Sequence, residues 1–182
     1  MLDHFHLVML VNAMVTDVRQ RALREQQGRR GMKVDPASAH RRLLLRNGDH
    51  LSPKARARLE TVFKTDDPSS EISAAWACKG LLRQLLAAHG PSRYSQHETA
   101  HRRTRFLAAC GTADMPETTR LEGTIETWWP EIEGFLELGV TNARTEDCNR
   151  VIKLIKRVAC GFRNQANYER RIMLHSAAHR AA

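Results

Sequence analysis

The sequence predicts a chain built almost entirely of α-helices. Apolar residues recur at steps of three and four along most of its length, and no convincing alternation of apolar and polar residues indicates a strand. Proline and small polar residues stand where several of these segments begin, and glycine stands where several end. With 182 residues, the chain is long enough for one fair-sized domain or two small ones.

The first expected helix is long and amphipathic and runs from His4 to about Gln26. The sequence GRRG at residues 28–31 ends it, and a basic loop follows. The apolar residues of this helix form one stripe, namely Leu7, Leu10, Val11, Met14, Val15, Val18 and Ala22.

The middle of the chain repeats one device, a capping residue followed by proline. Asp or Ser can cap the first turn of a helix, and proline suits its first position. The expected helices run from Asp35-Pro36 to Leu45, from Ser52-Pro53 to Thr65, and from Asp67-Pro68 to about Ala88.

Similar signals divide the rest of the chain. Ser95 and Glu98 form a capping box for a helix that reaches about Ala113. Pro116 opens the next helix, which Pro130 kinks or restarts, and Gly139 closes it. A basic helix headed by Glu146 and closed by Gly161, followed by a second basic helix, brings the total to roughly eight.

The charge balance points to a polyanionic partner. The chain carries 29 Lys and Arg against 20 Asp and Glu, a formal net charge of +9. This balance favours nucleic acid first and an anionic membrane surface second, although a merely basic surface would give it too. The acids gather in residues 117–137, which we interpret as a solvated acidic face.

Nothing in the sequence indicates export or a membrane span. No apolar run approaches the roughly 20 residues that cross a bilayer, and the apolar opening segment has no basic leader. The cysteines are dispersed, so we expect neither a disulfide framework nor a thiolate zinc site. A cytoplasmic protein with reduced thiols is the resulting expectation for Cys78, Cys110, Cys148 and Cys160.

The helix headed by Glu146 combines an acid with a row of cations on one face. Its other side is apolar, from Val151 to Val158. A carboxylate at the start of a helix is stabilised by the helix dipole. It could equally bind a divalent metal while the cations hold phosphates. The residues that share its face at helical spacing are Asn149, Arg150, Lys153, Lys156 and Arg157.

Three further patterns have both a chemical and a structural interpretation. Asp3 with His4 and His6 could ligate a metal, or could be a helix cap with partly buried histidines. Residues 97–101 (HETAH) match the HExxH signature of zinc peptidases, but Glu98 already belongs to the capping box. Residues 128–129, two tryptophans, could stack on bases, although packing in the core is the commoner role.

Three stretches together resemble the insertion-sequence transposases of the ISL-three family. They are DHFHLV at residues 3–8, EGTIETWWPEI at residues 122–132, and TNARTE followed by N..IK.IKR.A.GFRN at residues 141–164. The resemblance extends from Met1 to Ala182, and its closing motif is specific.

This resemblance implies a DDE transposase. Such enzymes use three acids and two divalent ions, Mg²⁺ or Mn²⁺, on a ribonuclease-H-like domain to cut donor DNA and join its ends to a target. By position, Asp3 matches the second acid and Glu146 the third, so both are implied catalytic residues and metal ligands. With the cations that follow, the expected DNA-binding residues are Asn149, Arg150, Lys153, Lys156, Arg157 and Arg163.

The chain departs from the family pattern in two ways. The family's first Asp lies upstream of the second, and this chain begins two residues before Asp3. The family usually has Gly after the third acid, whereas Asp147 and then Cys148 stand here, which alters the metal shell or the helix turn. We therefore expect the C-terminal part of a catalytic region, with residues 1–26 and 140–182 from the catalytic domain and residues 27–139 as a helical insertion.

The expected fold is thus mainly α, a helical insertion plus the C-terminal helices of an incomplete ribonuclease-H-like domain. The expected function is DNA transposition by a portion of a transposase that is inactive alone, because the first acid is absent. Transposon-end and target DNA are the expected partners, a homo-oligomer fits a transposition complex, no membrane partner is expected, and the location would be the bacterial cytoplasm at the nucleoid. Two alternatives stay open, a non-catalytic helical DNA-binding protein and a zinc peptidase built on His97, Glu98 and His101.

Overall fold

The computed structural model describes residues 4–139, 143–159 and 161–181. These residues form ten α-helices and one 3-10 helix and contain no strand, which confirms the mainly α prediction. They fall into two compact units, an N-terminal unit within residues 4–139 and a C-terminal unit within residues 143–181. None of the described helices is long and apolar enough to cross a bilayer.

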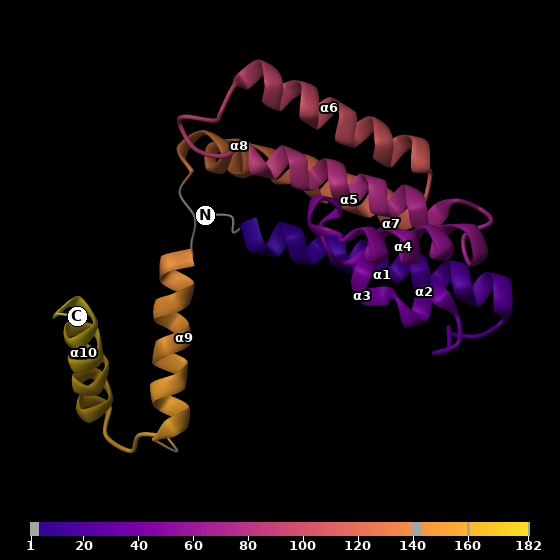
Figure 1. Cartoon of the computed structure of the whole chain (residues 1–182). Helices are drawn as coiled ribbons and strands as arrows, with labels where there is room; N and C mark the ends of the chain where they lie inside the picture. Colours follow the sequence, from indigo (N-terminus) through magenta and orange to yellow (C-terminus); the bar gives the residue numbers. More distant parts are fainter. Residues whose placement is uncertain (1–3, 140–142, 160, 182) are drawn as a thin grey trace. The chain divides into compact units, whose positions relative to one another are not determined.

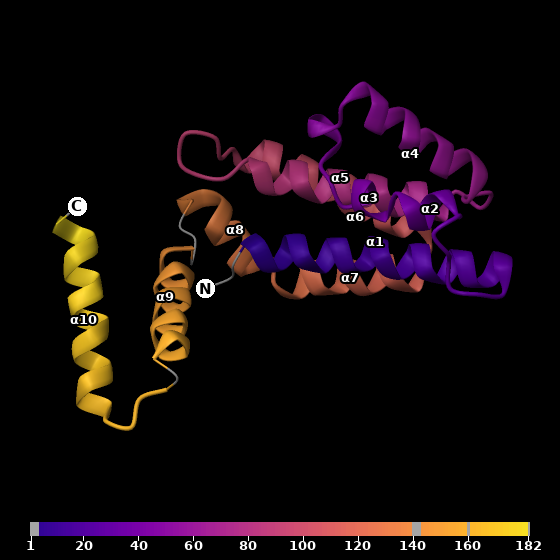
Figure 2. The ribbon, with the colours of Figure 1, turned by 60° about the horizontal axis from the view of Figure 1, so that its bottom comes forward.

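The N-terminal unit contains all of the described helices except α9 and α10 (Figures 1 and 2). The assignment of residues 27–139 to an insertion and of the flanking residues to a catalytic domain stays a prediction. The elements of this unit are α1 (His4–Gln27), α2 (Pro36–Ala39), α3 (Arg41–Leu44), η1 (Gly48–His50), α4 (Pro53–Thr65), α5 (Glu71–Ala87), α6 (Gln96–Ala113), α7 (Pro116–Thr127) and α8 (Trp129–Leu138).

Helix α5 is the centre of the N-terminal unit. It packs against α1 on one side and α6 on the other, and α7 contacts both of these helices. The predicted stripe of α1 is buried against this group, from Leu7 through Val11, Val15 and Val18. Leu10 is the exception, because 43% of it is exposed. The apolar faces of these helices therefore pack together into one core.

The observed starts of α4 and α5 test the capping signals that were read from the sequence. Ser52 caps α4 as expected, its Oγ accepting from the Ala55 N–H at 3.3 Å. The predicted start of α5 is too early, since the helix begins at Glu71 and not at Pro68. Asp67 lies before that start, and its carboxylate accepts from the N–H groups of Ile72 and Ser73 at 2.9 and 2.8 Å.

The predicted helix from residue 35 to residue 45 is divided at His40 into α2 and α3. The carboxylate of Asp66, at the end of α4, accepts from the Ala37 N–H in the first turn of α2 at 2.7 Å. This buried contact joins positions 29 residues apart. It gives the short helix the N-terminal partner that such a helix lacks by itself.

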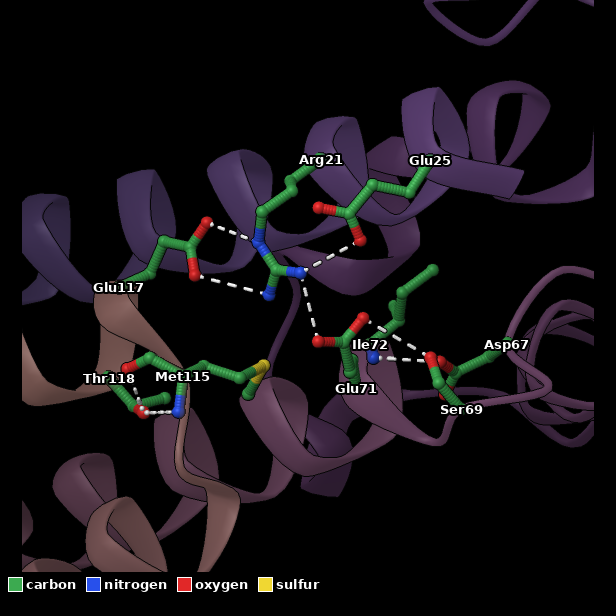
Figure 3. A network of polar contacts seen from close by, with 9 residues as sticks. All are labelled: Arg21, Glu25, Asp67, Ser69, Glu71, Ile72, Met115, Glu117 and Thr118. Carbon is green, nitrogen blue, oxygen red and sulfur yellow. Dashed lines mark hydrogen bonds and ion pairs between the residues drawn. The ribbon is translucent and has the colours of Figure 1, made fainter. Parts of the chain in front are cut away.

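Arg21 joins three helices through one guanidinium group (Figure 3). Its Nε and Nη2 donate to the two carboxylate oxygens of Glu117 on α7, at 2.9 and 3.3 Å. Its Nη1 lies 2.9 Å from Oε1 of Glu71 on α5 and 3.2 Å from Oε2 of Glu25 on α1 itself. The hydrogen bond that Arg21 donates to Glu117 is the main reason that the pKa of Arg21 is raised. Bidentate, partly buried pairs of this kind are the stronger class of ion pair.

Lys79 is the largest fully buried side chain of the described residues, with 1% of it exposed. Its Nζ donates to the carbonyl oxygen of Leu44 and, at 2.7 Å, to that of Arg46. It thereby satisfies carbonyl groups at the end of α3 that have no partner within the helix. Burial, and to a lesser extent the charge of Arg83, lowers the pKa of Lys79 to about 8.

We expect Arg21→Met to lower the free energy of unfolding by roughly 1–3 kcal/mol, because it leaves partly buried carboxylates without their cation. Urea denaturation measures this loss. Arg24→Met, three residues further along α1 at an exposed position, is the control and should cost less than about 0.5 kcal/mol. Equal losses in the two variants would contradict the role of the Arg21 cluster.

Lys79 should make the protein more stable at alkaline pH. Its folded-state pKa of about 8 lies below the ordinary value of 10.5, so between these values the unfolded chain binds a proton that the folded chain has lost, and stability rises with pH. A neutral amine still has two protons for the two carbonyl groups. Urea unfolding from pH 7 to pH 10 should show a rise of up to about 3 kcal/mol that is absent in Lys79→Met. Parallel pH profiles for the two proteins would refute the assignment.

Candidate functional site

The C-terminal unit is a pair of helices, α9 (Ala143–Val158) and α10 (Gln165–Ala181), joined by a short connection (Figures 1 and 2). Asn164 starts α10, its Oδ1 accepting from the N–H of Ala166 at 2.9 Å. The rings of Phe162 and Tyr168 lie 5.0 Å apart. These contacts hold the connection against the second helix.

Most of the predicted DNA-binding side chains lie together along α9. Asn149, Arg150, Lys153 and Arg157 are exposed and line one hollow together with Leu154. Lys156 is exposed in the last turn, and cations there are favoured by the helix dipole. Among side chains that the structure describes, no carboxylate forms an ion pair with these cations. Within the described side chains, the helix therefore presents a row of cationic donors without carboxylate partners.

The opposite side of α9 is apolar and faces α10. Ile155 and Phe162 are half-buried, whereas Val158 and Leu174 stay largely exposed along a groove between the two helices. Arg170 and Arg171 of α10 also line this groove. Sequence reasoning did not include these two arginines in the site, although they directly follow its basic stretch. Arg163, which it did include, is exposed in the connection.

The side chains of the two predicted metal-binding acids lie outside the described part of the chain. Asp3 lies outside the described residues, and Glu146 belongs to α9 at a position where only the backbone is described. Asp147 is likewise described in its backbone alone. Cys148 is exposed. The pairing of Asp3 with Glu146 therefore stays a prediction.

The HExxH residues take structural positions at the start of α6. The Glu98 N–H approaches Ser95 Oγ at 3.5 Å, which is the N-cap half of the predicted capping box. The Glu98 carboxylate instead accepts from Arg102 Nε at 2.9 Å. Zinc in a peptidase needs three protein ligands. Nowhere in the described part of the chain do three His, Cys, Asp or Glu side chains gather in a way that could hold a metal ion.

The two tryptophans have different environments. Trp129 packs against the core, and the Arg103 guanidinium lies 4.3 Å from the centre of its ring, the geometry of a cation–π contact. Trp128 does not pack in this way, because 47% of it is exposed. The expectation of core packing is therefore right for one of the pair.

Comparison with protein families decides what kind of protein this is. The family model of the ISL-three DDE transposases, described as "Transposase", matches residues 1–172. The chain belongs to this transposase family. The match confirms the resemblance found in the sequence. It supports a general transposase function and implies DNA as the partner. Searches of curated proteins and of solved structures find no match.

Proposed function

We propose that this transposase-family chain binds the phosphates of DNA through α9 and the connection that follows it. The observation that supports the proposal most directly is the row of exposed cations on one side of α9, from Arg150 to Arg157, without carboxylate partners among the described side chains. Neutralised phosphates release counterions, so such a row adds affinity for DNA of any sequence. The net charge of +9 also favours binding to DNA.

We further propose that the chemistry of the whole family site is of the DDE type, with Asp3 and Glu146 as two of its three acids. A divalent ion, Mg²⁺ or Mn²⁺, would polarise the phosphodiester that is cut. The described residues contain no group of three ligands for such an ion, and the side chains of both acids lie outside the described part of the chain. The support for this part is therefore membership of the family and the sequence motif.

Binding should depend steeply on salt and on the α9 cations. Lys153→Ala with Arg157→Ala should weaken binding of a 20-base-pair duplex about tenfold and reduce the slope of log K against log salt by about two, since two phosphate contacts are lost. Fluorescence anisotropy between 50 and 200 mM salt measures both quantities. Glu146→Gln should leave metal-free binding unchanged.

The matched control for charge removes two exposed arginines of the N-terminal unit, Arg24→Ala with Arg120→Ala. It changes the net charge as much as the α9 pair does. Equal weakening by the two double variants would show that only overall charge matters, and would remove α9 from the proposal.

The isolated chain should bind transposon-end DNA without joining it to a target, because the resemblance matches only two of the three acids to its residues. A Mg²⁺-dependent nicking and strand-transfer assay on labelled transposon-end duplexes tests this. Robust joining that Glu146→Gln abolishes would show that the chain is catalytically sufficient. Binding without any chemistry agrees with this expectation and also with the alternative of a non-catalytic DNA-binding protein.

A further inference from the structure

A second cationic hollow lies in the N-terminal unit, where the segment after α3 faces α5. We call it the α5 hollow. It encloses about 610 Å³, and its lining includes Arg46, Asn47 and Asp49 on one side and Trp76, Gly80 and Arg83 of α5 on the other. None of these residues belongs to the α9 site.

The charge around the α5 hollow is positive and largely uncompensated. Arg46 is exposed and Arg83 half-buried, and neither forms an ion pair within the described part of the chain. Lys79 also lines the hollow, and its bonds to two carbonyl oxygens satisfy two of its three donors without cancelling its charge. Asp49 is the one acid among the described residues of the lining. A negatively charged ligand would therefore gain Coulomb energy here, more than at a flat, fully solvated surface.

The shape of the α5 hollow leaves room for such a ligand. A Cβ atom built on Gly80 meets no atom within 4 Å, so open space lies over this part of α5. Across from it, a Cβ on Gly48 would lie 3.3 Å from Cη2 of Trp76, which brings the η1 turn close against the indole and forms a wall. The amides of Asn47 and Gln84 add hydrogen-bond donors beside the arginines.

Exposed cations also lie on the helices that precede and follow the η1 turn. Arg41 and Arg42 lie on α3, and Lys54 and Arg58 are exposed on α4, which packs against α3. A single small anion would use only the hollow. A polymer of phosphates could contact the hollow and these cations together, which favours the backbone of DNA over a free phosphate.

We propose that the α5 hollow binds a backbone phosphate of DNA, as a second contact site separate from α9. The choice of DNA as the source of the phosphate rests on the proposed function, whereas the site itself rests on the geometry of α5 and η1. Because the two sites have no residue in common, each can fail without the other.

The sharpest test fills the hollow without removing a cation. Gly80→Glu in the full chain places a carboxylate in the open space beside Arg83, and it should weaken duplex binding at 50 mM salt at least threefold and lower the salt slope by about one. Gly123→Glu is the matched control, because Gly123 lies in α7 at a position where an added Cβ also meets nothing within 4 Å. It should change affinity less than twofold.

Gly80→Ala leaves most of the hollow open and favours the helix, so it should bind DNA as the unchanged chain does. Thermal unfolding establishes that each variant is folded. If Gly80→Glu does not fold, Arg46→Ala with Arg83→Ala replaces it, with the same expected loss and with Arg24→Ala and Arg120→Ala as its charge control.

Wild-type affinity in folded Gly80→Glu would overturn the proposal. So would NMR signals of residues 46–49 and 76–87 that shift with inorganic phosphate or a mononucleotide but not with the duplex, because the ligand would then be a small anion. Loss of binding in Lys153→Ala with Arg157→Ala, but not in Gly80→Glu, would remove this site and keep the proposed function. The reverse result would keep this site and remove α9.

Discussion

The bonding of one arginine to carboxylates from three helices is the interaction on which the N-terminal unit depends. Arg21 lies on α1 and binds Glu117 of α7 and Glu71 of α5, so it fixes the positions of these helices where their apolar faces meet. Burial of apolar surface supplies most of the driving force for folding, but it is not directional and does not fix how the helices are oriented. A planar guanidinium paired with carboxylates does constrain the orientation of the helices, because its N–H groups bond well only over a narrow range of geometries.

Several acids of the N-terminal unit have structural partners. Glu117, Glu71 and Asp35 pair with arginines inside or beside the N-terminal unit. Asp66 and Asp67 are buried and accept from backbone N–H groups at helix starts. The cations of α9 and those around the α5 hollow have no such partners among the described side chains. These five acids therefore stabilise the fold, and the described cations of α9 and of the α5 hollow remain available for the DNA phosphates that we propose as their ligands.

Much of the fold follows from local patterns, because helical periodicity and caps act over a few residues. The long first helix, the Ser52 cap and a break near Pro130 were all expected from neighbours in sequence, although the break falls at Trp128 and Pro130 lies in the first turn of α8. The partners of Arg21 were not expected, because Glu117 lies 96 residues from Arg21 in the sequence and no local pattern indicates their contact. Lys79 was missed for a different reason, because lysine usually lies at the surface and only the carbonyl oxygens at the end of α3 explain its burial.

The candidate functional site was likewise only partly predictable from the sequence. Helical spacing alone places Asn149, Arg150, Lys153, Lys156 and Arg157 on one face, and all of these except Lys156 line one hollow in the structure. The roles of Asp3 and Glu146 come from the family resemblance and have no support from spacing. The α5 hollow could not be predicted, because Arg46 and Arg83 are 37 positions apart in the sequence and meet only through the packing of the η1 segment on α5.

We propose that uncompensated cations, and not the acidic helices, form the DNA-binding surface of this transposase. The most direct measurement is an NMR titration of the isotopically labelled full chain with a DNA duplex. We expect two clusters of shifted backbone signals, one in α9 and the following connection and one around residues 46–49 and 76–87, with residues 122–137 of the acidic helices unchanged. Shifts concentrated in residues 122–137, with α9 silent, would contradict the claim.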